Sequence, residues 1–464
     1  MSINRTLCND RQLLHSRRSI LQASSCGFGW LAFSSIASHA SSTRASSPDT
    51  KKGDFPAKAK RVIFLCMRGA PSHVDTFDYK PLLKNADGKE GPKKNSQWMA
   101  SPWKFNQQGE SGHWMSELFP ALGKQADKLC MIHSMQTDLP AHPQAMVRLH
   151  TGSSQFVRPS LGAWTLYGLG TENDNLPGFV VISPAGGAGG SQNYGSAFLP
   201  ANYQGTRIGS DKGDIQQSKM ANLAPAVGPQ RQQAELEFIQ SMNQEKLRRD
   251  QSNNELDGVI KSYELAYRMQ GEMPEVMDIS KESEETKNLY GLNSPKSANF
   301  GAKCLMARRM IESGVRFVEV SHGNWDHHFN IEQALPSSCE EIDRGAAGLL
   351  IDLERRGLLE ETLVVWTGEF GRTPYAQAKS GRDHNNKAFT LWMAGGGVKA
   401  GKSYGSSGDF GHEATENPVP IVDFHATMLA LLGLDHEKLT YRHAGRDFRL
   451  TDVKGRVVRD VIAS

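Results

Sequence analysis

Histidines and carboxylates stand beside one another at several points of this sequence, each time close to an apolar run. Asp326 precedes His328 by two residues, Asp383 directly precedes His384, and Glu369 closely follows an apolar run. Imidazole and carboxylate together are ligands of Zn²⁺, Mn²⁺ and Fe, whereas Ca²⁺ and Mg²⁺ prefer oxygen alone. These residues therefore predict a divalent metal site, with zinc or manganese as the expected cofactor.

Five side chains make up the predicted metal-ligand set. They are Asp75, Asp326, His328, Glu369 and His384. Each follows or precedes an apolar run of strand length, and the loops at one edge of a parallel sheet lie close together. The alternative interpretation is that these histidines are hydrogen-bonded residues of the scaffold and bind no ion.

The segment Gly368-Glu-Phe-Gly-Arg372 allows two interpretations. In one, Glu369 and Arg372 form an ion pair that orders the loop. In the other, Glu369 binds the metal and Arg372 grips a phosphate or sulfate group, for which the planar guanidinium is suited. In the second case Arg372 is a candidate catalytic residue that stabilises developing negative charge.

Short apolar runs alternate with helical segments along most of the chain, and Gly314, Gly357 and Gly433 end three of the predicted helices. This alternation predicts βαβ units and a mostly parallel sheet with its post-strand loops at one edge. Ligands bind at the carboxyl ends of the strands in such sheets. The predicted strands are 62–67, 129–132, 179–182, 315–320, 362–367 and 389–393, and the predicted helices are 230–269, 300–313, 340–356 and 423–432.

The first 40 residues have the pattern of an export signal. Arg17 and Arg18 precede a weakly apolar, uncharged stretch over 19–43, and Ser38-His-Ala40 is a small-x-small cleavage pattern. Paired arginines before such a stretch are typical of the twin-arginine (Tat) pathway, so the protein is expected in the periplasm or outside the cell. The alternatives are an uncleaved anchor and a lipoprotein cleavage site at Cys26.

The chain divides into a signal peptide over 1–40, a flexible linker over 41–60 and one domain over 61–464, with a helical insertion at about 225–300. The whole chain has 53 Lys and Arg against 50 Asp and Glu, and without the signal peptide each total is 49. A neutral mature chain argues against nucleic-acid binding and against a polybasic membrane surface. We expect no integral membrane span after processing, because the apolar stretch of the signal is too weak.

Four cysteines remain after the signal segment, namely Cys66, Cys130, Cys304 and Cys339. None belongs to a Cys-x-x-Cys pair, so their spacing does not predict a thiolate zinc site. Cys66 and Cys130 lie in apolar runs and are expected to be buried. An exported location permits one disulfide, whose partners the sequence does not identify.

Several motifs resemble the exported proteins grouped as domain of unknown function 1501. They are Arg68-Gly-Ala-Pro-Ser-His-Val-Asp-Thr-Phe-Asp78, Gly323-Asn-Trp-Asp-His-His328, Gly368-Glu-Phe-Gly-Arg-Thr-Pro374, Ser380-Gly-Arg-Asp-His384 and Gly445-Arg-Asp-Phe-Arg-Leu-Thr-Asp452. The resemblance extends from about Arg61 to the C-terminus. It implies an α/β, alkaline-phosphatase-like fold, with three α/β/α layers and a mostly parallel central sheet, and it implies no known reaction.

Residues of these motifs resemble metal ligands of the alkaline phosphatase and sulfatase superfamily. Glu369 stands at the place of a metal-binding aspartate, and Phe370 replaces the histidine that follows it. Asp326 and His328 are similar to a ligand pair from an earlier strand end. His384 matches the last metal-binding histidine.

Two positions depart from the superfamily pattern. Arg68 stands after the first strand, where the superfamily has a metal-binding aspartate, and Asp75 comes seven residues later. His142 stands at the place of the nucleophile, counted back from Gly152. The resemblance leaves His142 as a nucleophile, as a ligand or proton-transfer residue, or as a structural histidine.

The combined prediction is an exported, metal-dependent hydrolase with His142 and Arg372 as catalytic residues. Its substrate would be a small or polymeric anionic ester of phosphate or sulfate. The alternative is a non-catalytic binding or scaffolding protein on a degenerate alkaline-phosphatase-like fold.

Overall fold

The structure is a computed structural model that describes residues 51, 53–218, 220, 223, 227–250, 254–377 and 380–464. The predicted signal peptide over 1–40 and most of the predicted linker lie outside the described residues. The four cysteines at 66, 130, 304 and 339 are buried and free.

Nine strands of the described residues form one sheet, in the order β12-β4-β11-β8-β1-β7-β5-β6, with β13 paired to β4. β1 pairs in parallel with β7 and β8, whereas β11 is antiparallel to β8 and β4. The predicted mostly parallel sheet is therefore confirmed, with one reversed strand, β11, between β4 and β8. The strands are β1 (Arg61–Met67), β4 (Leu129–Gln136), β5 (Phe179–Ile182), β6 (Thr206–Ile208), β7 (Phe317–His322), β8 (Thr362–Thr367), β11 (Phe389–Ala394), β12 (Ser403–Tyr404) and β13 (Val419–Pro420).

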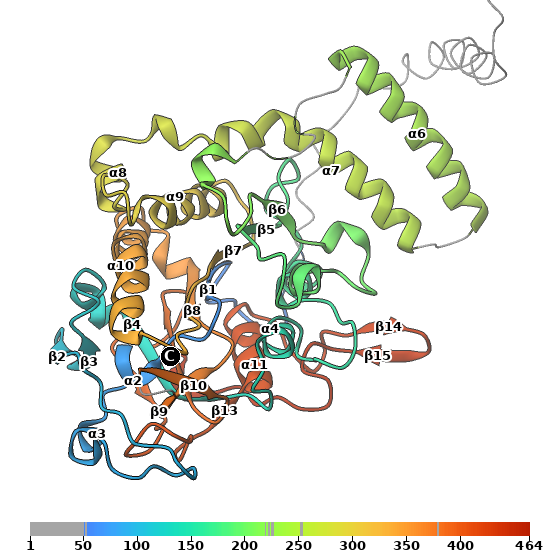
Figure 1. Ribbon diagram of the computed structural model, residues 1–464. Coiled ribbons are helices and arrows are strands. Elements are labelled where there is room, and N and C mark those ends of the chain that lie inside the picture. Colours follow the sequence, from blue (N-terminus) through green and yellow to red (C-terminus); the bar gives the residue numbers. More distant parts are fainter. Residues whose placement is uncertain are drawn as a thin grey trace, which may run out of the picture.

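Helices cover both faces of this sheet (Figure 1). Side chains of a strand alternate between its two faces, and those of β1 divide accordingly. Leu65 packs in one core with α9 (Ala298–Glu312) and α10 (Ile331–Arg355). Phe64 packs in the other core, and the helices there are α4 (His142–Thr151), α5 (Leu161–Leu169) and α11 (Ile421–Leu431). The predicted three-layer α/β/α fold is confirmed.

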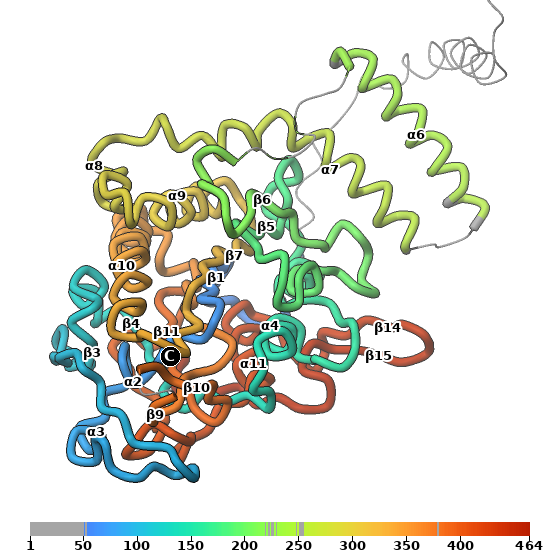
Figure 2. The backbone as a smooth tube through the Cα atoms, viewed as in Figure 1, coloured from blue at the N-terminus to red at the C-terminus, as the bar shows by residue number. Residues whose placement is uncertain are grey.

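The predicted helix over 230–269 is instead two helices, α6 (Pro229–Asp250) and α7 (Asn254–Met277). Ser252 and Asn253 precede α7 in the sequence, and these residue types favour helix caps over helix interiors. Figure 2 shows α6 projecting away from the sheet. The remaining elements are α2 (His73–Thr76), α3 (Pro81–Ala86), α8 (Glu284–Leu289), β2 (Phe105–Gln108), β3 (His113–Ser116), β9 (Gly371–Gln377), β10 (Gly381–Asn385), β14 (Tyr441–His443) and β15 (Arg446–Phe448).

A fully buried histidine joins α11 to α4. The Nε2–H of His425 donates to the carbonyl of Leu149 at 2.7 Å, and Nδ1 is buried without a hydrogen-bond partner. Burial lowers the pKa of His425 to about 3. Because the unfolded chain takes up a proton near the ordinary pKa of 6.5 and the folded chain does not, His425 stabilises the fold above that pH and loses this contribution as the pH falls.

We expect His425→Gln to flatten the acid dependence of stability. Between pH 6 and pH 4 the free energy of unfolding of the wild type should fall about 1.4 kcal/mol per pH unit more steeply than that of the variant. Denaturant unfolding at several pH values measures both slopes. Parallel slopes for the two chains would show that His425 does not stay neutral in the folded state.

Candidate metal centre

The chain brings the predicted site residues to one edge of the sheet. Asp326 and His328 follow β7, and Glu369 follows β8, which runs parallel to it through β1. His384 lies in β10, shortly before β11. Since β11 runs antiparallel to β8, it begins at the edge where β8 ends. Residues that precede β11 can therefore meet residues that follow β7 and β8.

Four side chains cluster there, namely His142, Asp326, His328 and His384, and each offers one ligand atom within 4.8 Å of the others. Asp326 Oδ1 lies 3.1 Å from Nε2 of His142, 2.9 Å from Nε2 of His328 and 3.6 Å from Nε2 of His384. Two ligands of one tetrahedral zinc ion lie about 3.3–3.6 Å apart, given bonds of about 2.0–2.2 Å. The three distances from Asp326 Oδ1 are therefore close to those within a first coordination shell.

The three histidines share a second feature. Each Nδ1–H donates to a fixed acceptor: His142 to Glu369 Oε1 at 2.5 Å, His328 to Gln377 Oε1 at 2.5 Å, and His384 to the carbonyl of Pro140 at 2.7 Å. In a neutral ring this leaves the Nε2 lone pair free, and such second contacts are usual for metal-binding histidines.

The contacts of these Nε2 atoms are those expected of ligands to a cation. Nε2 of His142 is buried without a hydrogen-bond partner, and Nε2 of His328 and Nε2 of His384 lie 2.9 Å apart. Three imidazole nitrogens and one carboxylate oxygen are a donor set suited to zinc and also acceptable to manganese. The residues present therefore fit a divalent ion.

The electrostatics of the cluster agree with this assignment. Burial alone would lower the pKa of His142, but the neighbouring carboxylates of Asp326 and Glu369 outweigh it and raise the pKa to about 9. Burial would raise the pKa of Asp326, but the neighbouring imidazoles of His142 and His384 and the hydrogen-bonded guanidinium of Arg372 hold it well below its usual range. The cluster thus favours positive charge next to an ionised carboxylate.

Glu369 contacts the cluster through His142. Its side chain is buried, and Oε1 and Oε2 accept the backbone N–H of Gly69 at 3.0 and 3.2 Å. Oε1 also accepts from His142, as described above. Glu369 therefore orients a ligand, an arrangement common around metal-binding histidines.

Arg372 lies entirely within the protein and uses its donors on protein acceptors. Nε donates to the carbonyl of Ala70 at 3.0 Å, and Nη1 donates to the carbonyl of Arg382 at 3.2 Å. Nη2 donates to Asp326 Oδ1 and to the carbonyl of Gly69, each at 2.5 Å. Arg372 thus holds Asp326 in place, so the predicted grip on a substrate anion finds no support in its contacts.

The structure does not bring Asp75 to this cluster. Asp75 lies in α2 with its side chain fully buried, and both oxygens accept from Arg382, at 2.6 Å from Nε and 3.0 Å from Nη2. Ser72 Oγ donates to the same carboxylate at 2.5 Å. Asp75 therefore forms an internal ion pair with Arg382 of β10.

Two acceptors of the cluster carry no signal that sequence reasoning could use. The side chain of Gln377 holds His328, and the main chain of Pro140 holds His384. A single glutamine in a strand and a backbone carbonyl have no characteristic spacing. His142 enters the predicted set only through the family resemblance.

Several solved structures are similar to this chain at low identity. The PsFucS1 sulfatase from Pseudoalteromonas sp. is 12% identical over 82% of this chain and 68% of its own, with a TM-score of 0.35. The lipoteichoic acid synthase LtaP from Listeria monocytogenes is 9% identical over 87% and 78%, with a TM-score of 0.38. The alkaline phosphatase from the Antarctic bacterium TAB5 is 11% identical over 76% and 97%, with a TM-score of 0.31.

No curated protein matches the sequence. Residues 59–462 match the family model described as "Protein of unknown function (DUF1501)". The match includes every motif on which the predicted membership rests, and it confirms that prediction. This chain belongs to the DUF1501 family of proteins of unknown function.

Proposed function

We propose that this protein is a divalent-metal-dependent hydrolase of phosphate or sulfate esters. One observation carries the proposal: three imidazole Nε2 atoms surround Asp326 Oδ1, and each ring is held by an acceptor at its Nδ1. The side chain of Asp326 is 47% exposed, so a solute can approach the cluster from solvent.

His142, Asp326, His328 and His384 would hold the ion. A bound zinc or manganese ion supplies Lewis-acid chemistry, because it polarises an ester oxygen and lowers the pKa of water. The surrounding protein keeps each histidine oriented, and Arg372 keeps Asp326 in place through a buried guanidinium.

The substrate class rests on the motif resemblance. Asp326, His328 and His384 stand at positions that resemble superfamily ligands, which supports a small or polymeric anionic ester as the substrate. The near-zero net charge of the mature chain argues against nucleic acid as a binding partner.

A second candidate is a metal-binding protein without hydrolytic activity. It is favoured by the contacts of the two predicted catalytic residues. His142 lies between Asp326 and Glu369. Arg372 donates its hydrogen bonds to Asp326 and to backbone carbonyls. Both groups serve the metal-ligand set, so neither is free to act on an ester.

Hydrolysis of p-nitrophenyl phosphate and p-nitrophenyl sulfate by the full chain, loaded with zinc or manganese, tests the proposal. We expect turnover that a chelator abolishes and added metal restores. His384→Ala should lose this turnover while retaining the fold, and His443→Ala, which replaces an exposed histidine of β14, should retain it. Stoichiometric metal at this centre without turnover of either ester, or of sugar phosphates and sulfates, would favour the second candidate.

We also propose export through the Tat pathway with cleavage near Ala40, which places the protein in the periplasm or outside the cell. The paired arginines before a weakly apolar stretch support this route. Among the helices that the structure describes, none has the length and apolar character to span a bilayer. Cell fractionation should find the Arg17→Lys/Arg18→Lys chain unprocessed in the cytoplasm, and normal processing of that chain would refute the proposed route.

A further inference from the structure

A second group of possible metal ligands lies on the face of the sheet opposite to α9 and α10. Cys66 belongs to β1, Glu319 to β7 and His150 to the last turn of α4. One atom from each lies within 4.8 Å of the others, and all three side chains are buried. His150 is eight residues along α4 from His142, about 12 Å at 1.5 Å per residue. This group is therefore separate from the centre around Asp326.

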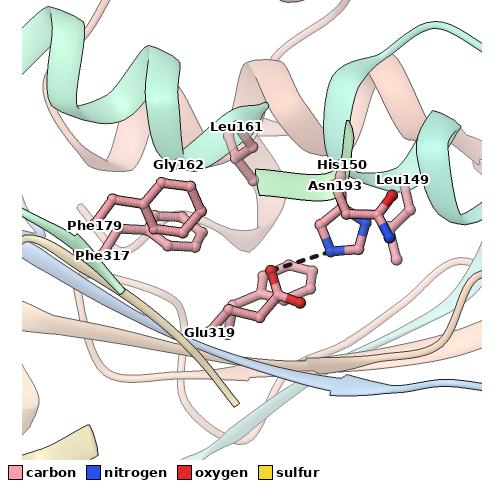
Figure 3. A pocket seen from close by; sticks show the side chains of 9 residues that line it. Leu149, His150, Leu161, Gly162, Phe179, Asn193, Phe317 and Glu319 are labelled. Carbon is pink, nitrogen blue, oxygen red and sulfur yellow. Dashed lines mark ion pairs between the residues drawn. The ribbon is translucent and has the colours of Figure 1, made fainter. Parts of the chain in front are cut away.

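The surroundings of this group are apolar except for Asn193, whose Oδ1 is buried without a hydrogen-bond partner. Figure 3 shows His150 and Glu319 pointing toward each other beside aromatic and aliphatic side chains. An ionised carboxylate in such surroundings costs several kcal/mol unless a cation or a strong donor compensates it. The lining apolar side chains are Phe64, Leu149, Leu161, Phe179 and Phe317.

His150 is oriented as a ligand would be. Its Nδ1–H donates to the carbonyl of Met146 at 2.8 Å, so Nε2 faces Glu319 Oε2 at 3.2 Å. Nε2 is buried and makes no hydrogen bond, although the carboxylate is near. A separation of 3.2 Å is close to the 3.3–3.6 Å or so expected between two ligands of one tetrahedral ion.

We propose that Cys66 Sγ, His150 Nε2 and Glu319 Oε2 bind a second divalent cation, for which zinc is the best match. Sulfur, nitrogen and oxygen are all accepted zinc ligands. A thiolate and a carboxylate together balance the charge of the ion, so the buried group is neutral as a whole. The thiol proton leaves when the ion binds.

The role of this ion would be structural. It would join the neighbouring strands β1 and β7 to the end of α4. The first residue of α4 is His142, a member of the cluster around Asp326. The second site goes beyond the proposed function and does not depend on it. The competing possibility is a metal-free ion pair between His150 and Glu319.

Zinc content of the purified full chain, measured after loading and desalting, tests the second site. We expect two zinc ions per wild-type chain, one in Cys66→Ser and one in His384→Ala. Cys130→Ser is the matched control, because Cys130 is also a buried strand cysteine and belongs to neither cluster. It should keep both ions.

Cobalt loading adds a readout specific to the thiol. A thiolate-to-cobalt charge-transfer band in the near ultraviolet should appear in the wild type and in His384→Ala, and it should be missing in Cys66→Ser. Should Cys66→Ser fail to fold, the isosteric Glu319→Gln should show the same loss of one zinc ion.

Two outcomes would overturn the inference. One is a His384→Ala chain that binds no zinc and shows no thiolate band with cobalt, which would leave His150 and Glu319 as an ion pair alone. The other is an unchanged zinc content in both Cys66→Ser and Glu319→Gln. A single zinc ion that survives His384→Ala and disappears in Cys66→Ser would support the second site and contradict the proposed function.

Discussion

His328→Ala is expected to weaken zinc binding at the cluster around Asp326 by more than about 100-fold. Loss of a supporting residue typically lowers metal affinity about 10–100-fold, and loss of a direct ligand should lower it further. His328 contributes one of the nitrogens next to Asp326 Oδ1, at 2.9 Å. Glu369→Gln is expected to cost only about 10–100-fold, because Glu369 orients His142 and does not bind the ion itself.

Competition with a chromophoric chelator measures both effects. The measurement is made in a Cys66→Ser background, so that zinc bound beside His150 does not contribute. His443→Ala, an exposed histidine of β14, is the control and should bind zinc as the parent does. If Glu369→Gln weakened binding as much as His328→Ala, Glu369 would be a ligand and the cluster would have to rearrange around the ion.

Asp75→Ala should destabilise the fold by about 3–5 kcal/mol, because it leaves the buried charge of Arg382 without its partner. Both side chains are completely buried, and the carboxylate accepts two hydrogen bonds from the guanidinium. Replacing both residues, as in Asp75→Leu/Arg382→Met, should cost much less, since no buried charge then remains unpaired.

Denaturant unfolding gives the free energies, and zinc titration of the folded variants gives the affinity. We expect Asp75→Ala to bind zinc like the wild type under conditions where it is folded. If Asp75→Ala instead had normal stability and weakened zinc binding, Asp75 would be a metal ligand, as the sequence predicted.

The strands show how much the sequence predicts about this fold. Residues 62–67 form a continuous apolar run, and β1 covers Arg61–Met67 with side chains packed into both cores. The predicted strands over 179–182 and 362–367 coincide with β5 and β8. Such runs can be recognised because burial on both faces requires apolar residues at every position.

The direction of β11 could not be predicted from the sequence. An apolar run of six residues is the same for a parallel and an antiparallel strand, and β11 is antiparallel to both neighbours. His384 comes before β11 in sequence, and only the reversed strand explains why it meets Asp326 at the carboxyl edge.

The sequence by itself therefore determined the α/β class, six strands of the sheet, and the place of Asp326, His328 and His384 in one cluster. Only the tertiary structure decided the role of each: His142 beside Asp326, Glu369 behind His142, and Asp75 in an internal pair with Arg382. It alone also joined Cys66 to His150 and Glu319, three residues far apart in sequence. The physical reason is that periodicity reports which residues are buried and where strands end, whereas a ligand set depends on the directions of side chains from separate elements, and a single sequence records no contact between them.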